Sequence, residues 1–128
     1  MRIVTLVARI LLGLMFVVFG LNGFLNFIPA TPPSGVAGSF LGALISSHYL
    51  YLVCAVQLIA GVLLLIDRFV PLALVLLASV IANIIAYHVT MQPSGAQLAV
   101  LATLLWIVLA WRFRACFAPL FVRKTVLN

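Results

Sequence analysis

Long apolar runs dominate the chain, and short polar or proline-rich breaks separate them. The apolar runs cover residues 3–27, 49–66, 69–91 and 96–113. A bilayer whose hydrocarbon core is about 30 Å thick is crossed by roughly 20 apolar residues in a helix. Each run therefore predicts a transmembrane helix. Together they predict an all-α, four-helix transmembrane bundle that forms a single membrane domain over residues 1–128.

The breaks contain residues that end or begin helices. Prolines, which lack an amide donor, follow the first run at positions 29, 32 and 33. At the tightest break we expect Asp67 to cap the incoming helix and Pro71 to lie in its first turn. Residues 92–95 turn the chain before the fourth run, and Ser94 is the expected cap there.

Residues 36–47 lie between the first two runs and are too few to cross a bilayer. One flank of a helix contains Phe40, Leu41, Leu44 and Ile45, while glycine and serine residues occupy other positions. This pattern is typical of a short interfacial or re-entrant helix. We expect such a helix between the first and second spans, close to the mouth of the bundle.

Composition excludes a water-soluble domain. Of the 128 residues, 67% are hydrophobic and 6% are charged, so too few polar side chains remain to cover a surface in water. Seven Lys and Arg residues against one acid give a net charge of +6. In a soluble protein this excess would favour nucleic acid as a partner, but here the cations flank apolar runs. We therefore expect the lipid bilayer, and no nucleic acid, as the partner of these cations.

Positive charges fall on one side of the predicted membrane. They are Arg2, Arg68, Arg112, Arg114, Arg123 and Lys124, whereas the two loops on the other side contain no Lys or Arg. Cytoplasmic loops carry the excess of Lys and Arg in membrane proteins. The expected location is the bacterial inner (cytoplasmic) membrane, with the N and C termini in the cytoplasm. The tail, residues 114–128, is expected either along the inner surface or loose.

Small residues at helical spacing predict which helices touch, because close packing of small residues joins helices in membranes. The contact faces of the first two spans contain Gly13, Phe16, Gly20 and Gly23, and Cys54, Gln57 and Gly61. These two faces are expected to meet. On the third span, Ala78, Ala82 and Ala86 recur every four residues and are expected to contact neighbouring helices.

The strong polar side chains of the spans gather in one half of the membrane. They are Asn22, Asn26, Gln57, Asn83, Tyr87 and His88. An amide that faces hydrocarbon without a partner is unfavourable, so we expect an interior cluster that opens toward the outer side. Two interpretations stay open: hydrogen bonds that only join the helices, or a polar pocket for a lipid-soluble molecule such as a quinone or lipid. A quinone is the one cofactor that this pattern suggests.

Arg9 is a cation within a predicted span, about 10 Å from the start of the span by helical rise. It can extend toward lipid phosphates. It can also pair with Asp67, the single carboxylate of the chain, which lies on the same side of the membrane. Both interpretations give Arg9 and Asp67 a structural role, which we favour over a catalytic one.

Residue sets that define several reaction classes are missing from the sequence. Cys54 is expected in the outer half of a span and Cys116 in the cytoplasmic tail, so they cannot form a disulfide within one chain. There is no CxxC pair, no pair of carboxylates and no Ser/His/Asp set. His48 and His88 have no ligand spacing, so we expect no metal site. We expect no catalytic residues and no enzyme that acts by itself.

Three stretches of the sequence carry a family resemblance. Residues 9–24 contain Arg9, Gly13, Gly20 and Asn22 in order, residues 57–71 run from Gln57 through Asp67 to Pro71, and residues 83–88 run from Asn83 to His88. In order and spacing these stretches resemble the DoxX family over nearly the whole chain. The resemblance implies a bacterial inner-membrane protein of four helices, similar to the small membrane subunit of thiosulfate:quinone oxidoreductase.

Two positions depart from the family pattern. Many relatives have a Lys near the position of Gly23 and a Glu near that of Gln57, and this chain has neither. The resemblance therefore implies an accessory component of a redox process that acts through a redox partner protein or a bound quinone or lipid. A membrane subunit of an oxidoreductase fits the same implication. A small-molecule membrane transporter and a ligand-free assembly or structural factor stay open as alternatives.

Overall fold

The computed structural model of the chain describes residues 2–28 and 31–126 and consists of helices. The elements in chain order are α1 (Arg2–Leu25), α2 (Gly35–Ser46), α3 (Tyr49–Ile66), α4 (Val70–Thr90), α5 (Ala96–Arg112), α6 (Arg114–Phe117) and the 3-10 helix η1 (Ala118–Phe121). Residues 29–30 of the predicted first break and residues 127–128 of the predicted tail lie outside the described residues.

The predicted fold class is confirmed. Helices α1, α3 and α4 are apolar and long enough to cross a membrane, and α5 together with the α6–η1 segment that follows it makes a fourth span if the bent pair is counted as one. The short apolar helix α2 lies between α1 and α3. Their ends differ by at most two residues from the predicted ranges, and α3 begins and ends where predicted. Helix α5 has 17 residues, and α6 with η1 follows it after a bend of 82°. The chain is thus a multi-pass membrane protein.

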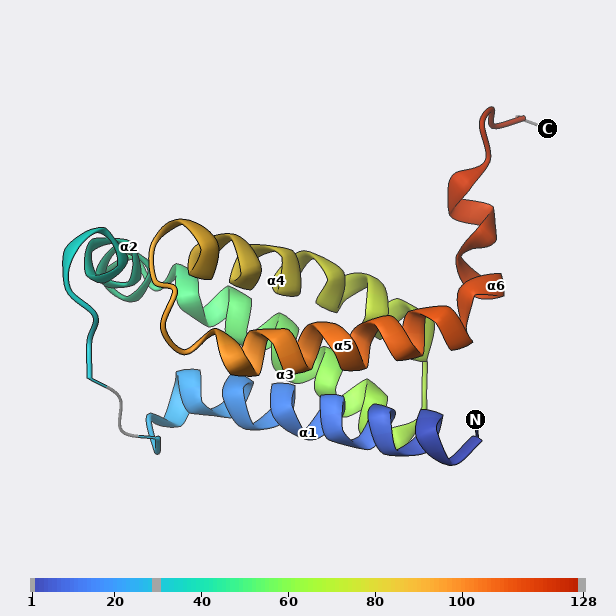
Figure 1. Cartoon of the computed structure of the whole chain (residues 1–128), viewed down its shortest axis with the longest axis horizontal. Helices are drawn as coiled ribbons and strands as arrows, with labels where there is room; N and C mark the ends of the chain where they lie inside the picture. The colour runs from blue at the N-terminus through green and yellow to red at the C-terminus, as the bar shows by residue number, and fades with distance from the viewer. Residues whose placement is uncertain (1, 29–30, 127–128) are drawn as a thin grey trace.

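The long helices form a ring in which α1 contacts α3 and α5, and α4 contacts the same two helices. Figure 1 shows the four lying side by side, with α2 at one end of the bundle and the start of α1 and α6 at the other. The largest fully buried side chains between them are Leu12, Phe16, Leu64, Leu74, Leu77 and Leu109. On the outside, large apolar side chains such as Val62, Leu72 and Leu104 are exposed, which suits contact with acyl chains.

Glycines bring the backbones of α1 and α3 into contact. A Cβ atom on Gly20 would lie 2.8 Å from the Leu58 nitrogen, and one on Gly61 would lie 2.8 Å from the Val17 nitrogen. Side chains at these positions would therefore force the helices apart. The predicted meeting of the glycine faces of the first two spans is confirmed, and it fixes α3 as one wall of the site described below.

The break between α3 and α4 differs from the expectation. Asp67 does not cap α4; it ends α3 in a left-handed conformation with φ 57°, and Phe69, with φ 52°, precedes α4. The backbone N–H of Arg68 donates to the Leu63 carbonyl oxygen at 3.1 Å, which satisfies one of the last carbonyls of α3. Pro71 lies in the first turn of α4, as predicted.

Ser94 is not a helix cap either. Gly95, with φ 82°, occupies the position before α5 and makes no side-chain cap. The Ser94 hydroxyl oxygen instead accepts a hydrogen bond from the Gln92 amide nitrogen Nε2 at 2.8 Å. The turn before α5 is therefore closed by side chains of the loop itself.

Candidate functional site

A pocket of about 520 Å³ lies between α2, α3 and α4. Figure 1 shows that α2 lies at one end of the bundle. Most of its wall is apolar. The lining residues are Phe40, Leu41 and Leu44 of α2; Tyr49, Leu50, Leu52, Val53, Val56 and Gln57 of α3; and Ser79, Val80, Asn83, Ile84, Tyr87 and His88 of α4. Mostly apolar walls with a few convergent polar groups are the usual composition of a small-molecule site.

Helix α2 supplies one wall of the pocket, although it is mostly exposed itself. Among its residues only Ala37 is buried. Phe40 faces Tyr87 of α4, with ring centroids 5.9 Å apart and an interplanar angle of 31°. Tyr87 also meets the His88 ring edge-on, with centroids 5.2 Å apart. These ring contacts connect the short helix to the polar side of α4.

Some polar side chains of α4 bond to their own helix. Asn83 Nδ2 donates to the Ser79 carbonyl oxygen at 2.8 Å, and Ser79 Oγ donates to the Leu76 carbonyl oxygen at 2.9 Å. Each bond satisfies a donor inside α4. The Asn83 carbonyl oxygen Oδ1 keeps its capacity to accept a further hydrogen bond.

His88 also bonds to its own helix. Its Nδ1 lies 2.9 Å from the Ile84 carbonyl oxygen, one turn back in α4. A carbonyl oxygen only accepts, so Nδ1 is the donor in this contact. In the neutral form of the ring, Nε2 is then an acceptor.

Gln57 differs from these residues. Its side chain is half-buried in α3 and lines the pocket, and it has no hydrogen-bond partner among the described residues. The Tyr87 hydroxyl is likewise without a partner in the described part of the chain. The pocket thus combines two available donor groups with apolar walls.

Asn22 and Asn26 lie outside the pocket. Asn22 Oδ1 accepts a hydrogen bond from the backbone N–H of Ile28 at 2.8 Å, which closes the turn after α1. Asn26 is exposed in a left-handed conformation with φ 52°, and its N–H donates to the Asn22 carbonyl oxygen at 2.8 Å. Both asparagines therefore form hydrogen bonds that close the C-terminal end of α1. Of the six residues expected to cluster, the structure brings together Gln57, Asn83, Tyr87 and His88.

The pocket also contains residues that sequence reasoning missed. Ser79 was not among the residues expected in the cluster, although it lies four residues before Asn83 and so shares its side of α4. Phe40, Leu41 and Leu44 were expected near the mouth of the bundle but not as a wall of the site. Their common flank on a short helix was the signal that could have identified them.

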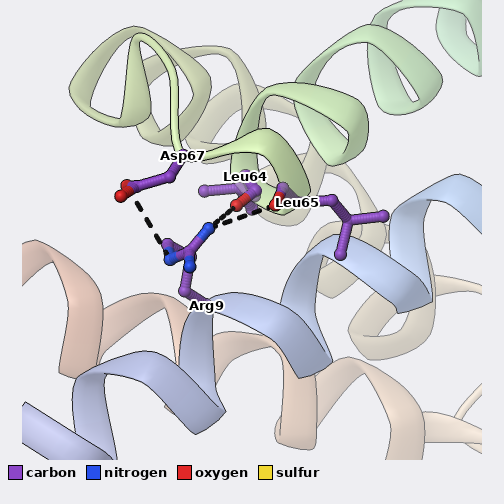
Figure 2. Close-up of polar contacts among 4 residues, drawn as sticks. All are labelled: Arg9, Leu64, Leu65 and Asp67. Carbon is purple, nitrogen blue, oxygen red and sulfur yellow. Dashed lines mark hydrogen bonds and ion pairs between the residues drawn. The ribbon is translucent and has the colours of Figure 1, made fainter.

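A second polar group lies at the other end of the bundle. Figure 2 shows the Arg9 side chain extending from α1 to the last turn of α3, beside Asp67. Arg9 Nη1 donates to the carbonyl oxygen of Leu64, and Arg9 Nε lies 3.8 Å from Asp67 Oδ1. The Arg9 side chain is 13% exposed and that of Asp67 is 68% exposed. Arg9 therefore bonds inside the protein, and this group joins α1 to α3.

One comparison with known proteins gives a match. The sequence model of the DoxX family matches residues 4–91, which include α2 and every residue that lines the pocket. No curated protein and no solved structure matches the chain.

Proposed function

The chain belongs to the DoxX family, and on that premise we propose that it is an accessory membrane component of a redox process. In this proposal it binds a quinone in the pocket between α2, α3 and α4 and works with a redox partner protein. A bound quinone would supply a carrier that accepts and releases electrons. The residues of the chain would bind and orient it.

The main support for the proposal is the position of the Gln57 amide. This side chain lies within a membrane-length helix, lines the pocket and has no partner among the described residues. Moving an amide from water into hydrocarbon without a hydrogen bond costs about 2–7 kcal/mol. A ligand with a carbonyl oxygen would accept from Gln57 Nε2 and remove that penalty.

The rest of the pocket fits the same class of ligand. A quinone has carbonyl oxygens on an apolar ring with an apolar tail. The Tyr87 hydroxyl offers a second donor, and Val53, Val56 and Ile84 offer apolar wall. The lining residues Phe40, Tyr49 and Leu52 are exposed, so an apolar tail would reach the bilayer beside them.

A partner protein is part of the proposal because of the side chains that the chain provides. The chain has one carboxylate in total, Asp67, and its two cysteines are both free, Cys54 buried and Cys116 exposed. Thiol–disulfide exchange needs an attacking and a resolving thiol. We therefore assign substrate oxidation to the partner and quinone binding to this chain.

The proposed setting is the bacterial inner membrane, with both termini in the cytoplasm. Arg2, Arg68, Arg112 and Arg114 belong to the end of the bundle where α1 begins and α5 ends, whereas α2 and its flanking loops contain no Lys or Arg. Cytoplasmic loops are enriched in these residues. The pocket would then lie toward the periplasmic half of the membrane.

The test is quinone binding by the full chain in nanodiscs. Wild-type protein purified gently should retain quinone in its extracted lipid, and after delipidation it should bind decylubiquinone saturably. Gln57→Leu should weaken that affinity about fivefold, because one hydrogen bond contributes about 1 kcal/mol. Tyr87→Phe should have an effect in the same direction.

Matched variants serve as controls. Gln97→Leu makes the same change at an exposed position of α5, and Tyr51→Phe removes a hydroxyl outside the pocket. Both should bind decylubiquinone like wild type. The proposal fails if wild-type protein neither retains quinone nor binds decylubiquinone saturably. It also fails if the Gln57 and Gln97 variants bind equally well.

A further inference from the structure

A second hollow lies at the opposite end of the bundle from the quinone pocket. Its volume is about 380 Å³, and it lies between the start of α4, the end of α5 and the C-terminal segment formed by α6 and η1. The lining residues are Val75, Ala78, Trp106, Arg114, Phe117, Leu120 and Phe121. We call this hollow the basal niche. It shares no lining residue with the quinone pocket.

The C-terminal segment turns across the end of the bundle. Its axis makes an angle of 82° with α5, and Figure 1 shows α6 projecting sideways from the end of that helix. If α5 crosses the bilayer, a segment at this angle lies close to the plane of the membrane surface. The side chains of Leu120 and Phe121, which are 66% and 79% exposed, then lie at the level where headgroups meet acyl chains.

Arg114 is the one charged residue that lines the basal niche. Its guanidinium lies over the Trp111 ring, 4.5 Å from the ring centroid, and its Nη1 donates to the Trp111 carbonyl oxygen at 2.8 Å. These contacts hold the group in place while its other N–H donors stay available. A guanidinium has five donors in a planar fork that matches phosphate oxygens.

Charge at this end of the bundle favours an anion. The cations on the loops and termini there are Arg2, Arg68, Arg112, Arg114, Arg123 and Lys124. Asp67 is the single carboxylate of the chain, and it lies beside Arg9. This end of the bundle is therefore strongly positive, and it is complementary to an anionic headgroup.

Depth distinguishes a lipid from a small soluble anion. Ala78 is eight residues after the start of α4 at Val70, which corresponds to about 12 Å along the helix axis. A molecule that contacts Arg114 and also reaches Ala78 has an anionic end and an apolar part that extends into the bundle. An acyl chain with a phosphate headgroup has both.

From this arrangement we propose that the basal niche binds an anionic phospholipid. The phosphate accepts hydrogen bonds from Arg114, and an acyl chain packs along Val75, Ala78 and Trp106. The C-terminal segment covers the headgroup end of that chain. The proposal is independent of quinone binding, because it concerns other residues at the other end of the protein.

Trp106 is a reporter inside the niche. In a Trp111→Phe background it is the only tryptophan of the chain. The full-length protein is reconstituted into two sets of phosphatidylcholine vesicles. One set contains acyl-brominated phosphatidylglycerol, and the other contains acyl-brominated phosphatidylcholine at the same mole fraction. Brominated chains quench tryptophan fluorescence on contact. Phosphatidylglycerol should occupy the basal niche about fivefold more than phosphatidylcholine. This factor corresponds to the attraction that one cation near the membrane surface exerts on an anionic lipid.

Variants separate a specific site from a general attraction. In the same background, Arg114→Gln should remove the preference for phosphatidylglycerol, whereas Arg112→Gln should keep it, because Arg112 does not line the niche. Arg114→Lys, which keeps the charge, should keep part of the preference. Ala78→Leu should reduce quenching by filling the niche, and Ala82→Leu, one turn deeper on α4 and outside it, should not.

Two results would overturn the proposal. One is equal quenching of Trp106 by the two brominated lipids in the reference protein. The other is an equal loss of preference in the Arg112 and Arg114 variants, which would show that charge near the membrane acts without a site. Ala78→Leu changes the apolar wall and leaves Arg114 in place. It therefore tests the niche even if Arg114→Gln lowers the yield of folded protein.

Discussion

Arg9 of α1 donates a hydrogen bond to the carbonyl oxygen of Leu64 in the last turn of α3 (Figure 2). The last carbonyls of a helix have no partner within that helix, and they form the negative end of its dipole. A cation from a neighbouring helix therefore adds a donor to the end of α3, where the Asp67 N–H also reaches the Leu64 carbonyl oxygen at 3.4 Å. Asp67, 3.8 Å from Arg9 Nε, adds an opposite charge on the exposed side of the guanidinium.

The two partners of Arg9 should contribute unequally to stability. Arg9→Leu should lower the free energy of unfolding by about 2 kcal/mol, because it removes a charged donor to a helix end. Asp67→Asn should lower it by less than about 1 kcal/mol, because an ion pair with an exposed carboxylate contributes little. Thermal unfolding of the purified variants in one detergent measures both. Equal losses would mean that the ion pair, rather than the helix cap, stabilises this end.

Close approach of α1 and α3 predicts a large effect from one added methyl group. A Cβ atom on Gly20 would lie 2.8 Å from the Leu58 nitrogen and 2.9 Å from the Cys54 carbonyl oxygen, and backbone atoms cannot rotate away. Gly20→Ala should therefore destabilise the protein by about 1–3 kcal/mol, as overpacking does. Thermal unfolding again provides the measurement.

Gly42 of α2 offers the control for that substitution. A Cβ atom there would meet nothing within 4 Å. Gly42→Ala should leave the stability unchanged or raise it by up to about 1 kcal/mol, because alanine has the higher helix propensity. If the two alanine variants melted at the same temperature, the contact between the helix backbones would not determine stability.

Sidedness can be tested with cysteine labelling. Ser34 precedes α2 and is exposed, and native Cys116 in α6 is exposed, whereas Cys54 is buried. In intact cells, a membrane-impermeant maleimide should label Ser34→Cys in a Cys116→Ser background. It should label native Cys116 only after the cells are broken. Labelling of Cys116 in intact cells, with Ser34→Cys protected, would reverse the proposed orientation.

The helices could be predicted because each follows from a local property of the sequence. Apolar runs of membrane length must be helical in a bilayer, since the backbone has no other way to satisfy its hydrogen bonds. Glycine spacing on the first two spans identified their contact because only glycine lets two backbones approach to the distance seen at Gly20 and Gly61.

Other features depend on backbone geometry that residue type does not determine. Asn22 and Asn26 have the polarity of pocket residues, but α1 ends there and their side chains and backbone close its final turn. Asp67 has the chemistry of a helix cap, but the short break places it at the end of α3 instead. In each case local hydrogen bonds of the backbone determined the position of the polar group.

The orientation of α4 could not be predicted from its alanines either. Ala82 and Ala86 were expected against neighbouring helices, and both are exposed in the structure. Leu74 and Leu77 are fully buried instead. Small residues permit close contact but do not require it, whereas larger apolar side chains fill more of the space inside the ring of helices.

Glycine contacts between α1 and α3 also restrict how the protein can move. Where backbone atoms of two helices touch, neither helix can slide or rotate against the other without a collision. We therefore expect the pair to move as one body. We expect any motion that admits a large molecule between α3 and α4 to come from α2, the wall of the pocket in which only Ala37 is buried.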